Sequence, residues 1–205
     1  MIFLTSNGLT SPELRRNFAG ALENTGKKCA IIPTAMEKDK QIDQWLEETR
    51  QELSDFGLES DIFYIGTDEN EKLLDYDVIY ICGGNVFYIM QKINEAEIAP
   101  VIAKCAEEKI VVGVSAGSLI MQKDLVLIKD LIPRMNKRVK LKDLSALNLT
   151  GGIEHLPHRT RYINTIEAFE KRVKTYEKKT GQKVICLEDG QGIIIDEGKT
   201  EYIIL

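Results

Sequence analysis

The sequence predicts an α/β fold in which a mostly parallel central sheet carries helices on both faces. Short apolar runs of strand length alternate with amphipathic stretches of helical spacing along the 205 residues. The apolar runs have no polar face, which is typical of parallel strands that are covered on both sides. No repeat, low-complexity segment or long linker interrupts the chain, so we expect one domain over residues 1–205.

The first half of the chain predicts five strands and the helices between them. Ser11 and Pro12 are typical of a helix start, with serine as the N-cap and proline at the first helical position. Three further segments, 40–53, 86–93 and 98–107, have apolar residues at helical spacing. The expected strands are residues 1–4, 29–32, 62–65, 78–82 and 110–114.

The second half is less regular. Segments 125–132 and 144–149 predict short strands or turns, and a helix is expected over 161–179. Three closing strands are expected, with turns at Asp189-Gly190 and Glu197-Gly198, and we expect them to run antiparallel at one edge of the sheet. These strands cover residues 184–187, 192–195 and 202–205.

The composition excludes several classes of function. Lysine and arginine total 27 against 32 aspartate and glutamate residues, a net charge of −5, whereas a nucleic-acid-binding protein usually presents a basic face. No apolar run approaches the roughly 20 residues that span a bilayer, and residues 1–5 do not resemble a signal peptide. The four cysteines form no C-x-x-C pair, which is typical of buried thiols in a reducing cytoplasm. We therefore expect a cytoplasmic protein with no nucleic-acid or membrane partner.

The strongest chemical signal is the sequence Gly113-Val114-Ser115-Ala116-Gly117, which fits the pattern G-x-S-x-G. A predicted strand precedes it and a helix can begin directly after it, as in a nucleophile elbow. A sharp turn there lifts the serine hydroxyl out of the sheet, and the helix start aims backbone N–H groups at developing negative charge. The pattern therefore predicts a nucleophilic Ser115. The alternative is a glycine-bounded turn with an incidental serine.

A serine nucleophile needs a general base, and the chain has two histidines, His155 and His158. Both lie in one loop that contains glycine and proline, so any histidine chemistry must come from that loop. The residues alone also leave open the acid that orients the histidine, because catalytic triads are defined by geometry and not by spacing. The candidate acids are Asp130, Asp143, Glu154, Glu188 and Asp189.

A second glycine signal follows the fourth predicted strand. Gly83 and Gly84 can expose backbone N–H groups beside the elbow and supply half of an oxyanion hole. Asn85 can either hydrogen-bond the substrate or cap the next helix. Arg159 and Arg161 can bind a carboxylate, because a guanidinium pairs with one through two hydrogen bonds; the alternative is a solvated helix start.

The combined pattern resembles the serine peptidase family typified by aspartyl dipeptidase (dipeptidase E) and cyanophycinase. The matching pieces are Gly-Gly-Asn at 83–85, Gly-Val-Ser-Ala-Gly at 113–117 and Pro157-His158, which occur in the family's order. The resemblance implies a flavodoxin-like three-layer sandwich similar to class I glutamine amidotransferases, and not a true α/β-hydrolase fold.

The resemblance also implies roles for residues that match the motifs. Ser115 would be the nucleophile, His158 the general base and Asp130 the acid that orients it. The backbone N–H groups of Gly84 and Ala116 would form the oxyanion hole.

These observations predict a serine hydrolase that cleaves short peptides, acidic ones included, through an acyl-enzyme. The expected partner is a short peptide or another small acyl substrate, contacted by Asn85, Arg159 and Arg161. No metal or organic cofactor is expected, and a homodimer is left open. Two alternatives remain: an esterase or amidase that acts on a non-peptide acyl compound, and a catalytically silent member of the fold that binds a ligand or serves in a stress response.

Overall fold

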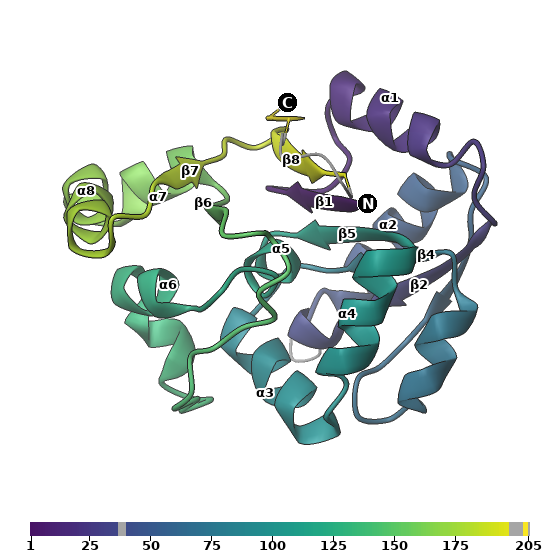
Figure 1. Cartoon of the computed structure of the whole chain (residues 1–205), viewed down its shortest axis with the longest axis horizontal. Helices are drawn as coiled ribbons and strands as arrows, with labels where there is room; N and C mark the ends of the chain where they lie inside the picture. Colours follow the sequence, from purple (N-terminus) through teal and green to yellow (C-terminus); the bar gives the residue numbers. More distant parts are fainter. Residues whose placement is uncertain (37–39, 197–202, 205) are drawn as a thin grey trace.

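Five parallel strands make up most of the sheet. The computed structural model describes residues 1–36, 40–196 and the backbone of 203–204. Within these residues the strand order is β3-β2-β4-β5-β1-β8-β9, and β8 and β9 form an antiparallel edge next to β1. Figure 1 shows β8 beside β1. The strands are β1 (Ile2–Thr5), β2 (Lys28–Ile32), β3 (Glu59–Ile62), β4 (Val78–Ile81), β5 (Ile110–Val114), β8 (Gly192–Ile195) and β9 (Ile203–Ile204).

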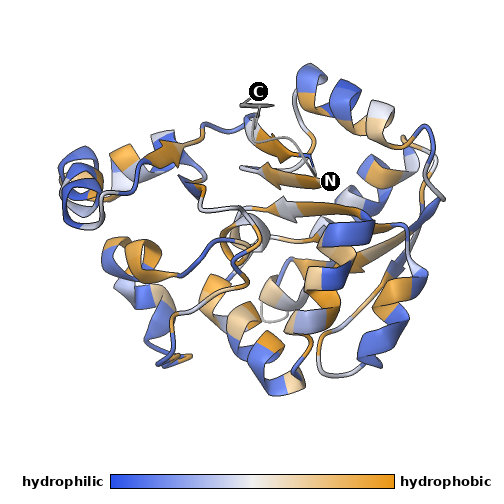
Figure 2. Ribbon diagram, viewed as in Figure 1, coloured by the Kyte–Doolittle hydropathy of each residue, from blue (hydrophilic) through white to orange (hydrophobic). Residues whose placement is uncertain are grey.

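The strands are apolar on both faces because helices cover each face. In β1, Phe3 packs into one core with Leu14 and Phe18, whereas Ile2 and Leu4 belong to the larger core on the opposite face. Figure 2 shows hydrophobic strands in the centre and hydrophilic residues on the outer helical surfaces. The helices are α1 (Pro12–Ala21) and α2 (Ile42–Ser54) on one face, and α3 (Val86–Ala96) and α4 (Ala99–Glu108) on the other.

The predicted start of the first helix is confirmed. Pro12 opens α1, and the Ser11 side chain accepts a hydrogen bond from the Leu14 N–H at 3.3 Å. This hydroxyl satisfies one of the backbone donors that the first turn of a helix leaves unpaired.

The parallel register brings three loops to one edge of the sheet. β5 lies between β1 and β4, and the Ser115 N–H donates to the Thr5 carbonyl at 2.9 Å just beyond the paired residues. The loops that follow β1, β4 and β5 therefore meet at the carboxyl edge, where open α/β sheets usually bind ligands. These loops carry Ser6, Gly83-Gly84 and Ser115.

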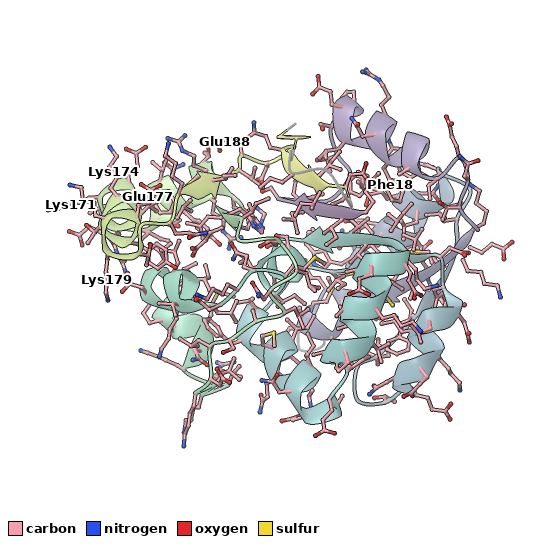
Figure 3. The ribbon with its side chains drawn as sticks, in the orientation of Figure 1. Phe18, Lys171, Lys174, Glu177, Lys179 and Glu188 are labelled. Atoms are coloured by element: carbon pink, nitrogen blue, oxygen red, sulfur yellow. The ribbon has the colours of Figure 1, made fainter. Side chains whose placement is uncertain are left out.

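A two-stranded sheet and three helices lie beside this edge. β6 (Glu154–Leu156) pairs in parallel with β7 (Val184–Cys186), and α6 (Val126–Leu131), α7 (Arg159–Thr165) and α8 (Phe169–Thr180) lie next to them (Figure 1). The outer surface of α8 is lysine-rich, as Figure 3 shows at Lys171, Lys174 and Lys179. No helix in the described part of the chain is long and apolar enough to cross a membrane.

The third strand lies three residues earlier than predicted. Residues 62–65 carry the hydrophobic signal, but β3 ends at Ile62. β3 is an edge strand that pairs only with β2, so its own side chains are half-buried or exposed. Phe63 and Ile65, which follow the strand, are the residues that enter the core.

The segment after the elbow also differs from its prediction. Within residues 125–132, Val126–Leu131 form helix α6, with Leu127, Ile128 and Leu131 buried on one side. A short apolar run fits a helix and a strand equally well, which explains the wrong assignment. The helix predicted over 161–179 is divided into α7 and α8, and Ala168 between them adopts a left-handed conformation with φ 52°.

The closing strands are confirmed in part. β8 and β9 form the predicted antiparallel edge, whereas β7 pairs with β6, a strand that the sequence did not predict. Residues 144–149 form no strand, apart from one isolated bridge between Asp124 and Ser145. The predicted Glu197-Gly198 turn lies outside the described residues.

Candidate active site

Ser115 occupies a sharp turn between β5 and the short helix α5 (Ala116–Leu119). Its backbone has φ 50° and ψ −106°, a conformation that L residues rarely adopt. The two flanking glycines make the turn sterically feasible. A Cβ atom on Gly113 would lie 2.6 Å from the Gly117 carbonyl oxygen, and one on Gly117 would lie 2.1 Å from the Ile81 carbonyl oxygen. The G-x-S-x-G pattern therefore has a direct packing cause.

His158 faces the Ser115 hydroxyl. Its Nε2 atom lies 3.0 Å from Ser115 Oγ, which is hydrogen-bonding distance. His158 immediately precedes α7 and has a left-handed backbone with φ 58°. Its ring also meets the buried Tyr162 ring edge to face, with 6.4 Å between centroids. Backbone conformation and packing thus both aim the imidazole at the elbow.

Asp189 completes a chain of three polar side chains. Its Oδ1 atom lies 2.6 Å from His158 Nδ1. Partial burial alone would raise the pKa of Asp189, but hydrogen bonds from Ser6 and His158 outweigh it and lower that pKa. The turn between β7 and β8 presents this carboxylate, and Gly190 at φ 89° allows the turn.

The predicted pairing of Asp130 with His158 is wrong. Asp130 lies on α6, and its carboxylate pairs with Arg172 of α8 at 3.2 Å. The cause is the helical conformation of residues 126–131, which directs Asp130 toward α8. Asp189 is among the candidate acids in the sequence, but sequence spacing gives no geometric basis for preferring it.

The loop after β4 closes against the elbow. Gly84 has φ 133°, and a Cβ atom there would lie 2.3 Å from the Ala35 carbonyl oxygen, so only glycine fits. A Cβ atom on Gly83 would lie 3.3 Å from Ser115 Cβ. In the described part of the chain, the N–H groups of Gly84 and Ala116 have no hydrogen-bond acceptor. Neither N–H is therefore engaged by the described part of the protein, and Gly84 lies in the wall of the space beside Ser115.

Two of the predicted substrate contacts serve the fold instead. Asn85 caps α3: its side-chain oxygen accepts the Phe87 N–H at 3.0 Å and its amide donates to the Met135 carbonyl at 3.0 Å. The Arg159 guanidinium pairs with Glu188 at 2.9 Å and with Glu170 at 2.8 Å. Glu188 is one of the residues labelled in Figure 3. The expectation that Asn85 and Arg159 contact the substrate is therefore not supported.

Two cavities meet at Ser115 and His158, and Gly84 and Arg161 line both of them. The first, of about 480 Å³, also contains Arg134 and Arg172 and lies next to α7. The second, of about 510 Å³, lies between the loop after β1 and helix α2. The residues of α2 that line it include Trp45, Glu48 and Glu52. These volumes are within the usual range for small-ligand pockets.

Arg161 is the predicted arginine that reaches the cavities. No hydrogen bond or ion pair engages its guanidinium within the described residues. It is therefore free to pair with a carboxylate at the junction where Ser115 lies.

Cys82 is a second potential nucleophile at the edge of the second cavity, but its environment makes it inert. Burial raises the pKa of its thiol to about 12, and the neighbouring Glu52 carboxylate acts in the same direction. Because the thiolate is the reactive form, this thiol is unreactive at neutral pH. The described residues contain no group of three or more His, Cys, Asp or Glu side chains arranged to hold a metal ion.

His155 lies behind the elbow and is fully buried. Its Nε2 atom is 2.9 Å from Ser118 Oγ, and that hydroxyl donates to the Ser115 carbonyl at 2.7 Å. Ser118 has one hydroxyl hydrogen, so His155 must be the donor to Ser118 and its Nδ1 is unprotonated. That Nδ1 has no hydrogen-bond partner among the described residues. His155 thus supports the elbow from within the core and does not face the Ser115 hydroxyl.

The buried His155 should make folding stability depend on pH. Burial lowers its pKa from 6.5 to about 3, so between these values the unfolded chain takes up a proton that the folded protein excludes. The stabilisation that the neutral His155 gives to the folded protein is therefore complete above pH 6.5. As the pH falls from about 6.5 to 5, the free energy of unfolding decreases by roughly 2 kcal/mol because of this group. His155→Gln keeps an amide donor for Ser118 but does not titrate. We would measure urea unfolding of the unmodified protein and of His155→Gln at about pH 7 and pH 5. The free energy of unfolding should decrease less in the variant, and equal decreases would contradict this role of His155.

Ser6 is a site residue that the sequence analysis missed. Its hydroxyl lies against both His158 and Asp189. The available signal was its position two residues after the first predicted strand, at the same edge of the sheet as Ser115.

Comparisons with known proteins identify the family to which the chain is similar. The model of the family described as "Peptidase family S51" matches residues 2–203. An uncharacterized peptidase of Pasteurella multocida is 28% identical over 95% of this chain and 93% of its own length. Another from Listeria monocytogenes is 30% identical over 87% of each chain.

Solved structures support the same family and fold. The crystal structure of a putative peptidase E protein from Listeria monocytogenes matches with a TM-score of 0.76 and 25% identity, over 100% of this chain and 96% of that one. A peptidase from an acI-B1 actinobacterium shares the fold with a TM-score of 0.69 and 16% identity, over 100% and 86% of the two chains. The expected flavodoxin-like α/β sandwich is confirmed. Because the family model matches nearly the whole chain, the chain belongs to peptidase family S51, and it is a hydrolase.

Proposed function

We propose that this protein is a serine peptidase of the dipeptidase E type that hydrolyses short peptides through an acyl-enzyme on Ser115. The observation that carries the proposal is the continuous arrangement of Ser115 Oγ, the His158 ring and the Asp189 carboxylate, with separations of 3.0 and 2.6 Å. Nucleophile, base and orienting acid within hydrogen-bond reach are the geometric signature of a triad.

In the first half-reaction, Ser115 Oγ attacks the carbonyl carbon of the scissile bond while His158 Nε2 takes the hydroxyl proton. Asp189 holds the Nδ1 proton of His158 and stabilises the imidazolium that forms. The tetrahedral oxyanion accepts hydrogen bonds from the Gly84 and Ala116 N–H groups, which have no other acceptor in the described part of the chain. His158 then gives its proton to the leaving amine, and the C–N bond breaks.

In the second half-reaction, water replaces the amine. His158 takes a proton from the water, the hydroxide adds to the acyl carbon, and the same N–H groups hold the second oxyanion. Collapse of this intermediate breaks the bond to Ser115 Oγ, which regains its proton from His158. The acid is released and the enzyme returns to its starting state.

The preference for short substrates is supported by the two cavities on either side of Ser115, each of about 500 Å³. One can hold the acyl part of a peptide and the other the leaving amine. We test this with a panel of dipeptides, longer peptides, esters and simple amides. The proposal is supported if the unmodified enzyme hydrolyses dipeptides and Ser115→Ala eliminates this hydrolysis. Turnover of esters alone would favour an esterase, and no turnover of any substrate would favour a silent binding protein.

Arg161 should favour acidic substrates, because its guanidinium is free at the cavity junction. We expect Asp-Leu to be cleaved with a higher kcat/KM than Ala-Leu, and Arg161→Gln to lower that ratio about tenfold or more by removing a charged hydrogen-bond donor. Arg159→Gln is the matched control, because Glu188 and Glu170 already hold that guanidinium. Equal kcat/KM values for the two dipeptides in the unmodified enzyme would contradict the role of Arg161.

A further inference from the structure

Ser6 holds both partners of the histidine–aspartate pair from the opposite end of the chain. It directly follows β1, is fully buried, and its N–H donates to the Gln191 carbonyl at 3.1 Å. Its hydroxyl oxygen lies 2.7 Å from Asp189 Oδ1 and 2.9 Å from the His158 backbone nitrogen. The same oxygen is 3.3 Å from His158 Nδ1.

The proton count assigns each of these contacts a direction. The single hydroxyl hydrogen of Ser6 goes to Asp189 Oδ1, the shorter contact and the acceptor with a negative charge. The Ser6 oxygen is then the acceptor for the backbone N–H of His158. Asp189 Oδ1 receives two donors, the Ser6 hydroxyl and His158 Nδ1–H at 2.6 Å.

Both groups that Ser6 binds need such support. His158 adopts a left-handed backbone, a conformation that surrounding contacts must maintain in a residue other than glycine. The Asp189 side chain is 57% exposed, so protein packing alone does not fix its rotamer. A buried hydroxyl at the end of a central strand is a rigid point from which to fix both.

We propose that Ser6 is a positioning residue that sets the His158 backbone and the Asp189 carboxylate together, so that the imidazole points at Ser115. This inference rests on the proposed function. Ser6 lines the second cavity but is fully buried, and no hydrogen bond among the described residues joins it to Ser115 Oγ or to the N–H groups of Gly84 and Ala116. Its loss should therefore slow the chemical steps and leave substrate binding in place.

The kinetic test compares Ser6→Ala with Ser6→Thr, which keeps the hydroxyl, and Ser6→Cys, which keeps the shape with a weaker donor. We expect Ser6→Ala to lower kcat about ten- to hundredfold with KM within about twofold, because small displacements of aligned groups cost rates of this size. The kcat of Ser6→Cys should fall similarly, and Ser6→Thr should recover activity. Ser11→Ala is the matched control: it also removes a hydroxyl that accepts a backbone N–H, at a helix cap outside both cavities.

The spectroscopic test uses the fact that His155 and His158 are the chain's two histidines. In ¹⁵N-histidine-labelled protein, the His158 Nδ1 proton should give a protected, downfield signal in the unmodified enzyme. Ser6→Ala should speed its exchange with water and weaken the signal, whereas the signals of His155 should stay unchanged and report an intact fold.

The outcomes separate this inference from the proposed function. An unmodified enzyme that cleaves no peptide would overturn the proposed function, while the His158 signal still tests the positioning geometry. An active enzyme whose Ser6→Ala variant keeps its kcat, or keeps an unchanged His158 signal, would overturn the role of Ser6. If Ser6→Ala does not fold, Ser6→Cys decides by the same two readouts.

Discussion

Replacing Asp189 with asparagine should lower kcat/KM for a dipeptide by about three to four orders of magnitude. The amide keeps the size of the carboxylate but has no charge, and it can leave His158 in the tautomer that cannot accept the Ser115 proton. Substitutions of this kind in a serine triad cost about 10⁴-fold. The distance of 2.6 Å between Asp189 Oδ1 and His158 Nδ1 makes Asp189 the residue where this loss is expected.

Asp130→Asn is the matched control for Asp189→Asn. It breaks only the pair with Arg172, in which the Asp130 side chain is 65% exposed, and such pairs contribute about 0–1 kcal/mol to stability. We expect kcat/KM within about threefold of the unmodified enzyme. The reverse pattern, with a large loss for Asp130→Asn and a small one for Asp189→Asn, would restore the role that the family resemblance implied for Asp130.

Ser115→Ala and His158→Ala should each lower kcat by about 10⁵- to 10⁶-fold, and the double variant should be no worse than either. The two groups act as one unit, so the second removal finds nothing left to disrupt. Neither side chain is needed for the core, and thermal unfolding should show folded variants. Effects that multiply in the double variant would show that the two residues act independently, contrary to a shared proton transfer.

The fold was largely predictable because its first half obeys local rules. The predicted strands of 29–32, 78–82 and 110–114 are apolar on both faces, and the helix start at Ser11-Pro12 has its own capping signal. Predictions failed where tertiary packing decides between equal local options. Residues 126–131 form a helix because Leu127, Ile128 and Leu131 pack on one side, and the sequence pattern alone does not reveal this.

The candidate site also has residues that the sequence predicts and residues that it does not. Ser115 and the glycines around it were predictable, because a sharp turn with close backbone contacts leaves a pattern in the sequence. Ser6 and Asp189 are 183 positions apart, and only the pairing of β1 with β8 brings them together. Arg159 and Arg161 are equivalent as a sequence pattern. Only the carboxylates of Glu170 and Glu188 distinguish the bound guanidinium from the free one.

Mapping the adduct of a fluorophosphonate probe tests the central claim most directly. The serine that attacks such a probe displaces fluoride and keeps the phosphonyl group, which tandem mass spectrometry can locate. We expect one adduct per chain, on the peptide that contains Ser115, and no adduct in Ser115→Ala or His158→Ala. An adduct on another residue, or equal labelling of the Ser115→Ala protein, would contradict the assignment of Ser115 as the nucleophile.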